Sequence, residues 1–255
     1  MKLVEVIIPI YNEEKVLKKQ CRLLAKFFDS LIGKNKWNFI FVDNGSTDNS
    51  KNIIKEIVNL NGRYFFKQDP NYGAALREGI INCNSKYAFI CDIDQWDLPF
   101  FSWCWAHRDR FDHMLGSRRS DPTINKAPKI RKLLSLGLNV MILILFNYMG
   151  TDTHGPKFVN MEKIKKTAKK VKSRRGQFDT ELLIRLSRGG FKIAEAPIEH
   201  FETRKNKFPI FKKVSWNIYA ILKMYFFLRN IKWNKKIYFN QFCRDDVLKI
   251  YKKKF

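Results

Sequence analysis

Apolar positions in the first hundred residues form short runs rich in β-branched side chains, and these runs alternate with amphipathic stretches of helical period. We predict strands at 4–10, 39–43, 64–67 and 87–92, and helices at 13–28, 50–60 and 73–81. Asn71 is the expected N-terminal cap of the last of these helices. Strands that alternate with helices are typical of βαβ units, so the pattern predicts an α/β fold with a mostly parallel sheet.

The residues that directly follow each predicted strand are the first candidates for a functional site. Open parallel sheets bind ligands at the carboxyl ends of their strands. These positions are 11–13, 43–48, 68–71 and 92–97.

A different pattern begins after Lys132, where 19 residues at 133–151 carry no charge. That length is sufficient for a membrane span. Ser135, Asn139 and Asn147 fall, however, within about a third of a helical wheel, which favours a helix lying in the membrane interface. A buried core helix and a true span are the two alternatives.

A second amphipathic stretch, at 208–233, mixes large aromatic side chains with lysine and arginine, as interfacial helices do. It lies within a basic part of the chain. The whole sequence has 49 Lys and Arg against 24 Asp and Glu, a net charge of +25. Such an excess requires an anionic partner, for which nucleic acid, acidic lipid and a phosphorylated substrate all qualify.

The cysteines and the N-terminus indicate the compartment. Five scattered cysteines, never spaced as C-x-x-C, favour neither a disulfide framework nor a zinc site. The first residues lack the apolar core and small-residue cleavage site of a signal peptide. We therefore expect a cytoplasmic protein without a signal peptide.

Asp92 and Asp94 are the most informative polar residues, because both follow a predicted strand directly. Two carboxylates one residue apart can bind one hard cation, which in turn neutralises a diphosphate. The spacing is common by itself, since acidic residues also cap helices, as Asp97 would do for a helix at 98–109.

Four strand-end motifs together are more specific than any one of them. Pro9-Ile10-Tyr11-Asn12-Glu13, Asp43-Asn44-Gly45-Ser46, the glycine-containing segment 71–79 and Asp92-Ile93-Asp94 occur in this order. Their order and spacing resemble the nucleotide-sugar-binding half of family 2 glycosyltransferases. The chain contains neither G-x-G-x-x-G nor G-x-x-x-x-G-K-[ST], which argues against a dinucleotide enzyme or an ATPase.

The second half of the chain resembles a narrower group, the dolichyl-phosphate mannose and glucose synthases and related polyprenyl-phosphate transferases. The resemblance rests on Gly116-Ser117-Arg118, Arg131, the segments 151–155, 178–181 and 190–198, and Arg204. It covers about residues 4–210 and implies a GT-A fold, which is a Rossmann-like, mostly parallel sheet flanked by helices, with two interfacial amphipathic helices added.

The resemblance also implies roles for individual residues, carried over by position. The nucleotide sugar would contact Pro9, Tyr11, Glu13, Asp43, Asp92 and Asp94. A cofactor, Mg²⁺ or Mn²⁺, would bind Asp92, Asp94 and Gln95. The family motif is D-x-D-x-Q, with its glutamine two residues after the second aspartate, whereas this chain has Trp96 at that position and Gln95 before it. The acceptor phosphate would bind Arg118, Arg131 and Arg204. Asp94 and Arg204 would be the catalytic residues, with Arg204 closing as a lid.

The resemblance divides the chain into a GT-A catalytic domain at 1–207, with an interfacial helix at about 129–149, and basic amphipathic membrane-associating helices at 208–255. The expected enzyme moves a sugar, with inversion, from a UDP- or GDP-sugar to a polyprenyl (dolichyl-type) phosphate. It would be peripheral on the cytoplasmic face of a membrane and bind no nucleic acid. An ionised lipid phosphate needs little help from a general base.

Two other functions remain open. A family 2 enzyme that glycosylates a saccharide or protein hydroxyl would need a general base, for which Asp152, Asp179 and Glu181 are candidates. A non-catalytic basic protein that binds membranes or nucleic acid would account for the charge but not for the strand-end motifs.

Overall fold

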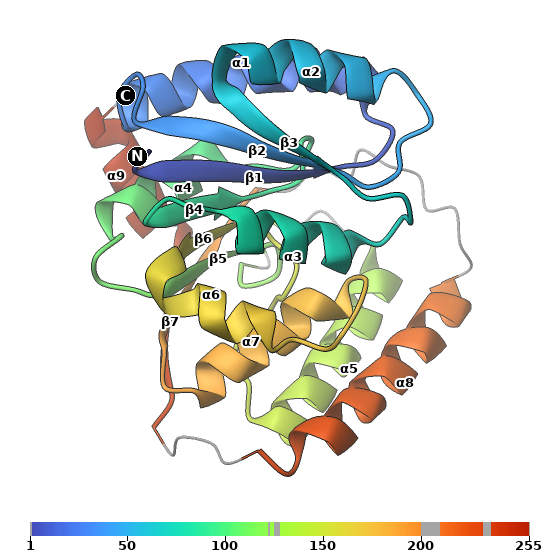
Figure 1. Ribbon diagram of the computed structural model, residues 1–255. Coiled ribbons are helices and arrows are strands. Elements are labelled where there is room, and N and C mark those ends of the chain that lie inside the picture. The colour runs from blue at the N-terminus through green and yellow to red at the C-terminus, as the bar shows by residue number, and fades with distance from the viewer. Residues whose placement is uncertain (1, 122, 125–127, 200–209, 232–235, 255) are drawn as a thin grey trace.

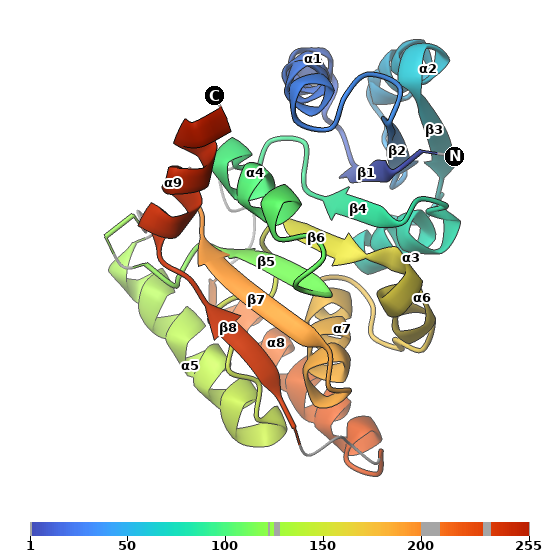
Figure 2. The ribbon, with the colours of Figure 1, turned by 90° about the vertical axis from the view of Figure 1, so that its left-hand side faces the viewer.

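The computed structural model describes residues 2–121, 123–124, 128–199, 210–231 and 236–254. Within them, eight strands form one sheet in the order β3-β2-β1-β4-β6-β5-β7-β8 (Figures 1 and 2). The strands are β1 (Val4–Ile10), β2 (Trp37–Asp43), β3 (Gly62–Phe66), β4 (Tyr87–Ile90), β5 (His113–Ser117), β6 (Lys157–Asn160), β7 (Lys192–Pro197) and β8 (Tyr238–Gln241). Only β6 runs antiparallel to its neighbours, β4 and β5, among these pairs.

Helices cover both faces of the sheet, and each face has its own apolar core. One core lies under α1 (Glu14–Leu31), α2 (Ser50–Asn61), α4 (Leu98–Ala106) and α9 (Arg244–Lys254). The other lies under α3 (Tyr72–Asn82), α5 (Lys129–Phe146), α6 (Met161–Lys169), α7 (Gln177–Arg188) and α8 (Ile210–Leu228). Strand β1 is buried on both sides, which explains why its sequence is a continuous apolar run.

The predicted elements of the first hundred residues are confirmed, with small shifts at their ends. Asn71 caps α3, because its Oδ1 accepts a hydrogen bond of 3.2 Å from the backbone N–H of Ala74. Asp97 caps α4 in the same way, through Phe100. That helix ends at Ala106, before the predicted position, and β4 ends at Ile90 because the chain then turns.

Helix α5 begins and ends earlier than the uncharged stretch that predicted it. It spans Lys129–Phe146, and Asn147 ends it in the left-handed conformation, at φ 54°. Of the helices in the described part of the chain, none combines the length and apolar character that crossing a bilayer requires.

The predicted boundary at residue 207 lies outside the described residues, so the domain division stays a prediction. Beyond it, α8 is the helix expected in the second amphipathic stretch. Residues 236–254 contribute β8 to the edge of the sheet and α9 to the core beside α4.

Candidate active site

Polar segments gather at one edge of the sheet because of the direction of each strand. Strands β1, β2, β4 and β5 end at this edge, and β6, which runs the opposite way, begins there. Lys157, the first residue of β6, is in register with Ile90 of β4 and Leu115 of β5. The reversal therefore brings the segment 151–157 next to the acidic residues that follow β4.

The loop after β2 is fixed by the carboxylate of Asp43. This side chain is buried and accepts hydrogen bonds from the Ser46 N–H at 2.9 Å and from the Tyr64 hydroxyl at 3.1 Å. Burial, helped by the Asp43 charge, raises the pKa of Tyr64 to about 12. Asp43 thus lies at the base of the loop, at the end of β2.

The loops after β1 and β2 hold each other. Asn12 has φ 56°, and its Oδ1 accepts a 2.7 Å hydrogen bond from the Thr47 N–H. Gly45 has φ 81°, and a Cβ there would lie 2.6 Å from the carbonyl oxygen of Gln68, so only glycine fits. Of the predicted nucleotide contacts on β1 and its loop, Pro9 is buried in the strand, whereas Tyr11 is exposed at the edge.

Asp92 and Asp94 lie in a tight turn after β4, closed by a 3.1 Å hydrogen bond from the Gln95 N–H to the Asp92 carbonyl. Both carboxylates are half-buried. Desolvation, and then the carboxylates of Asp92 and Asp179, raise the pKa of Tyr72 well above its usual value. Tyr72, in the first turn of α3, therefore lies near Asp92 and Asp94. The sequence did not predict this contact.

The acidic turn offers the oxygen ligands that a hard divalent cation prefers. No group of three or more His, Cys, Asp or Glu within the described residues is arranged to hold a metal ion. Two carboxylates from Asp92 and Asp94 match the way Mg²⁺ is usually held, by one or two carboxylates with substrate phosphates completing the shell. The residues present therefore fit a metal that binds together with a diphosphate.

Arg118, predicted to bind the acceptor phosphate, is paired with Asp152. Its Nε and Nη2 donate to the two carboxylate oxygens at 2.8 and 3.0 Å. Burial alone would raise the pKa of Asp152, but the guanidinium outweighs it and holds that pKa well below its usual value. The bidentate pair fixes the plane of the guanidinium, on which the charge of Asp92 also acts.

The carboxylates considered as general bases are all bound to cations. Asp179 contacts the Nζ of Lys157 at 2.9 Å, with both side chains buried. Burial raises the pKa of Asp179, and Lys157 opposes the shift. The three pairs are Asp152 with Arg118, Asp179 with Lys157, and Glu181 with Arg185 at 2.6 Å.

Two of the predicted arginines are not placed by the structure. Arg131 belongs to the first turns of α5, but its side chain is outside the described part. Arg204 lies outside the described residues altogether. Their roles, like those of the other site residues, stay predictions.

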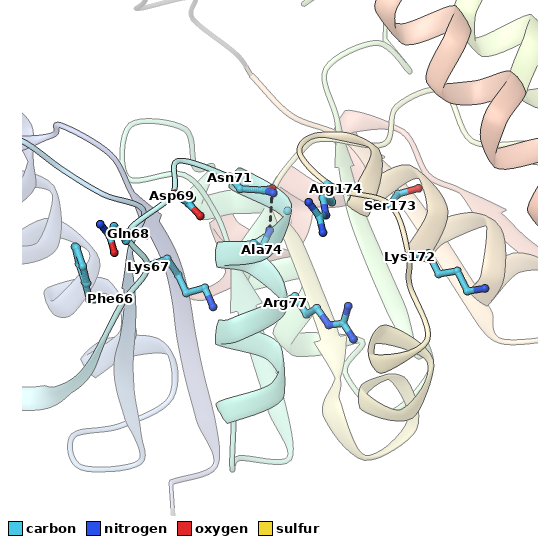
Figure 3. A pocket seen from close by; sticks show the side chains of 11 residues that line it. Phe66, Lys67, Gln68, Asp69, Asn71, Ala74, Arg77, Lys172, Ser173 and Arg174 are labelled. Atoms are coloured by element: carbon cyan, nitrogen blue, oxygen red, sulfur yellow. Dashed lines mark hydrogen bonds between the residues drawn. The ribbon is translucent and has the colours of Figure 1, made fainter.

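A basic pocket of about 540 Å³ borders the same edge and was not predicted (Figure 3). The segment 172–174 forms one wall and the segment 66–69 forms the other, with α3 between them. Arg77 joins α3 to the chain just before the wall at 172–174, because it donates to the carbonyls of Lys169 and Val171 at 2.8 and 3.2 Å. The cations at the pocket are Lys67, Arg77, Lys172 and Arg174.

Comparison with known proteins identifies the family. Residues 5–134, more than half of the chain, match the family described as Glycosyl transferase family 2. The chain belongs to this family. It is a glycosyltransferase, and the family-matched segment contains all four strand-end motifs.

Curated relatives of this family 2 glycosyltransferase cover most of the chain. A dolichyl-phosphate beta-glucosyltransferase of Saccharomyces cerevisiae is 28% identical over 229 residues, which is 79% of this chain and 68% of that protein. One from Trichomonas vaginalis is 27% identical over 223 residues, 80% of this chain and 67% of its own length. A UDP-N-acetylglucosamine--dolichyl-phosphate N-acetylglucosaminyltransferase of Methanococcus voltae is 26% identical over 231 residues, 79% of this chain and 87% of its own.

Solved structures confirm the GT-A fold. Glucosyl-3-phosphoglycerate synthase from Mycobacterium tuberculosis, in complex with UDP, superimposes with a TM-score of 0.65 at 16% identity, covering 88% of this chain and 80% of that one. The mannosyltransferase PcManGT from Pyrobaculum calidifontis, in complex with GDP-Man and Mn²⁺, gives a TM-score of 0.59 at 13% identity, covering 91% and 66%.

Sequence reasoning identified the acidic turn of this family 2 enzyme but missed several buried partners. Lys157, Tyr72 and Glu195 were given no role. Glu195 had a signal, because it is a single carboxylate within the otherwise apolar strand sequence KIAEAP. A charged side chain in a buried strand needs hydrogen-bond or ion-pair partners, because burying it alone is costly.

Proposed function

We propose that this glycosyltransferase transfers a sugar from a UDP- or GDP-sugar to a polyprenyl (dolichyl-type) phosphate, with inversion, at the cytoplasmic face of a membrane. The observation that carries the acceptor is the outward apolar face of α5. The names of the curated relatives, which are dolichyl-phosphate sugar transferases, support the same acceptor.

Helix α5 has apolar side chains on its outward face, unlike a helix at a water-exposed surface. Asn139 faces the protein, where it donates to the carbonyl of Thr151 and accepts from Arg119 at 3.2 Å. Ile142 and Phe146 also face the protein and are buried in its core, but other apolar side chains face outward: Leu133 and Ile144 are 64% and 76% exposed. Exposed apolar surface of this kind marks an interface with lipid or protein, and here we assign it to lipid.

Helix α8 extends this surface, since it packs beside α5 (Figure 1). Its aromatic side chains are turned outward, with Trp216, Tyr219 and Phe226 between 50% and 60% exposed. Aromatic rings that are apolar with a polar tip favour the boundary between headgroups and acyl chains. We call the exposed apolar side chains of the two helices the α5–α8 surface; they are Ile130, Leu133, Leu136, Val140, Leu143, Ile144, Trp216, Ile218, Tyr219, Leu222 and Phe226.

The donor half of the proposal rests on the strand-end loops. Pro9, Tyr11, Glu13 and Asp43 would surround the nucleoside. Asp92, Asp94 and Gln95 would hold Mg²⁺ or Mn²⁺, and the bound ion would neutralise the diphosphate as it leaves. The presence of Mn²⁺ in complexes of structurally similar enzymes supports this cofactor.

The reaction needs alignment and charge more than proton transfer. An oxygen of the ionised acceptor phosphate attacks the anomeric carbon, the bond from that carbon to the donor diphosphate breaks, and the bonding electron pair leaves with the nucleoside diphosphate. Arg118, held by Asp152, would orient the acceptor phosphate, with Arg131 and Arg204 completing its site. The rival reaction at a hydroxyl needs a free base, whereas each candidate base is bound to a cation.

An acceptor assay tests this function. A thermal-shift screen of UDP- and GDP-sugars with Mg²⁺ or Mn²⁺ first identifies the donor. The radiolabelled donor is then incubated with polyprenyl phosphate and, separately, with soluble glycans. Label that partitions with the lipid phosphate is the expected result. Label found only in water-soluble glycan would show that the acceptor is a hydroxyl.

Asp94→Asn tests the metal assignment. The amide keeps the size of the side chain but removes the negative charge, so we expect a loss of kcat/KM of about 100-fold or more, as for removal of other groups that stabilise transition-state charge. The midpoint of thermal unfolding should remain near that of the wild type. Asp245→Asn, at an exposed position of α9, is the matched control. Full activity of Asp94→Asn in the presence of a chelator contradicts the assignment.

A further inference from the structure

Arg244, the first residue of α9, is a buried cation near the acidic turn that the sequence analysis did not single out. Helix α9 packs against α4 and also contacts β7 (Figure 2). The Arg244 side chain is 10% exposed, and its Nη1 contacts the Asp97 carboxylate at 2.7 Å. The same nitrogen donates to the carbonyl of Pro197, the last residue of β7, at 3.1 Å. One guanidinium thus joins α9, the start of α4 and the end of β7.

Asp97 is the last residue of the acidic segment 92–97, three positions after Asp94. Its Oδ1 accepts a hydrogen bond from the N–H of Phe100, which caps α4, and its Oδ2 accepts one from the N–H of Glu199 at 3.1 Å. Oδ2 is also the atom that Arg244 contacts. The ion pair therefore holds the end of the acidic segment against the residues that follow β7.

The end of β7 in turn borders the arginine predicted to bind the acceptor phosphate. Pro197 is in register with Ser117, the last residue of β5. The Ile198 N–H donates to the Ser117 carbonyl at 2.9 Å, and Arg118 is the residue that follows Ser117. A chain of direct contacts therefore runs from the acidic segment through Arg244 and β7 to the residue before Arg118.

Stability alone is a weak reason for this buried ion pair. Burial raises the pKa of Asp97, and the charge of Arg244 opposes that shift. The cost of taking two charges out of water can exceed their attraction, and apolar side chains of similar volume often replace such a pair without loss of stability. Apolar side chains cannot, however, replace the direction of the contacts, because hydrogen bonds to a charged group fix the positions of their partners.

We propose that Arg244 is a positioning residue for sugar transfer, which holds the acidic segment at a fixed distance from Arg118. The acidic turn would hold the donor diphosphate and Arg118 the acceptor phosphate, so their separation determines how the acceptor oxygen approaches the anomeric carbon. This inference rests on the proposed function, which assigns these two sites. It gives α9, which lies over the core opposite α5 and α8, a part in catalysis.

Removing both charges of the ion pair tests the proposal. Arg244→Met alone leaves the buried Asp97 carboxylate unpaired, so the midpoint of thermal unfolding should fall. Adding Asp97→Asn removes that charge and keeps a side chain that caps α4, so the double variant should unfold near the wild-type midpoint. Its kcat should nevertheless fall by about 10- to 100-fold. The KM for the acceptor and the affinity for the nucleoside diphosphate with Mn²⁺ should be unchanged, because each site by itself is intact.

Arg244→Lys is the conservative variant and should keep most of the wild-type kcat, because one nitrogen makes both contacts and an ammonium group has three donors. Lys18→Met with Glu56→Gln removes an exposed ion pair between α1 and α2 and is the control, for which we expect the wild-type kcat. A double variant of Arg244 and Asp97 with the wild-type kcat overturns the proposal, and so does one whose loss lies entirely in its affinity for the donor. A wild type that transfers sugar to no polyprenyl phosphate contradicts the proposed function instead, and the same comparison with the acceptor that it does use still tests Arg244.

Discussion

Glu195 connects the core of the sheet to the predicted acceptor site. The side chain is buried in β7, and its carboxylate accepts hydrogen bonds from the Thr151 N–H at 2.9 Å and the Thr151 hydroxyl at 2.6 Å. It also accepts a 3.4 Å hydrogen bond from the N–H of Asp152, the residue that holds Arg118. Glu195 thus helps to position Arg118, the arginine predicted to bind the acceptor phosphate, through Asp152.

Glu195→Gln should change how stability depends on pH. Desolvation raises the pKa of Glu195 from 4.5 to about 7. A carboxyl group whose pKa is higher in the folded state contributes stability below its unfolded pKa, and that contribution is lost as pH rises through the folded pKa. The wild type should therefore lose unfolding free energy between about pH 4.5 and pH 7, by up to about 1.4 kcal/mol per pH unit. Glutamine does not titrate, so the variant should lack this slope.

Urea unfolding of both proteins across this pH range measures the difference. Glu162→Gln, at an exposed position of α6, is the control and should behave as the wild type does. Parallel pH profiles for wild type and Glu195→Gln would refute the account of this buried carboxyl.

At the residue scale, the sequence predicts which polar side chains directly follow a strand. It does not predict which side chains from distant parts of the chain form hydrogen bonds or ion pairs with them. Asp92 and Asp94 were predictable because they follow a buried apolar run directly. The pairing of Arg118 with Asp152 joins positions 34 residues apart, and it depends on the antiparallel course of β6. A strand of four residues, Lys157–Asn160, has too short an apolar pattern to reveal its direction.

At the scale of elements, α5 shows what periodicity can and cannot give. The uncharged stretch at 133–151 predicted a helix, and the polar residues within it indicated one polar side. Which side faces the protein depends on partners such as Thr151 and Arg119, which periodicity does not contain. The first strands and helices were predictable because each satisfies its pattern locally, whereas β8 pairs with β7 across more than forty residues of sequence.

Ile144→Glu tests whether the α5–α8 surface contacts lipid. The side chain is 76% exposed, so the substitution should leave the unfolding free energy nearly unchanged. Losing the burial of an isoleucine in the acyl region, worth about 1.5–3 kcal/mol, should weaken vesicle binding by about 10-fold or more. Leu23→Glu on α1, under which the opposite core lies, is the matched control and should bind vesicles as the wild type does. Equal binding by all three proteins would remove lipid contact from the function of this surface.

At the scale of the whole molecule, part of the positive charge that gives the chain its net +25 lies beside the apolar α5–α8 surface. The basic segment 172–175 lies next to α8, because the guanidinium of Arg175 stacks on the Trp216 ring at 5.6 Å and Gln177 donates to Asn217 at 2.9 Å. Lys172 and Arg174 are exposed in the same segment and line the basic pocket. In an anionic membrane, the negatively charged headgroups lie next to the apolar acyl chains. The basic segment would contact the headgroups while the apolar α5–α8 surface contacts the acyl chains.

This arrangement predicts that vesicle binding has an electrostatic part and an apolar part. Raising the salt from about 0.1 M to 1 M shortens the Debye length from about 10 Å to about 3 Å, so binding to anionic vesicles should fall while a residual affinity persists. Lys172→Glu with Arg174→Glu should lower binding to anionic vesicles and leave binding to neutral vesicles unchanged. Lys15→Glu with Lys19→Glu makes the same change of charge on α1, away from the α5–α8 surface, and should have the smaller effect. If both double variants weaken vesicle binding equally, the attraction depends on the net charge alone and not on segment 172–175. If salt-sensitive binding is found for RNA rather than for vesicles, the basic residues bind a nucleic acid.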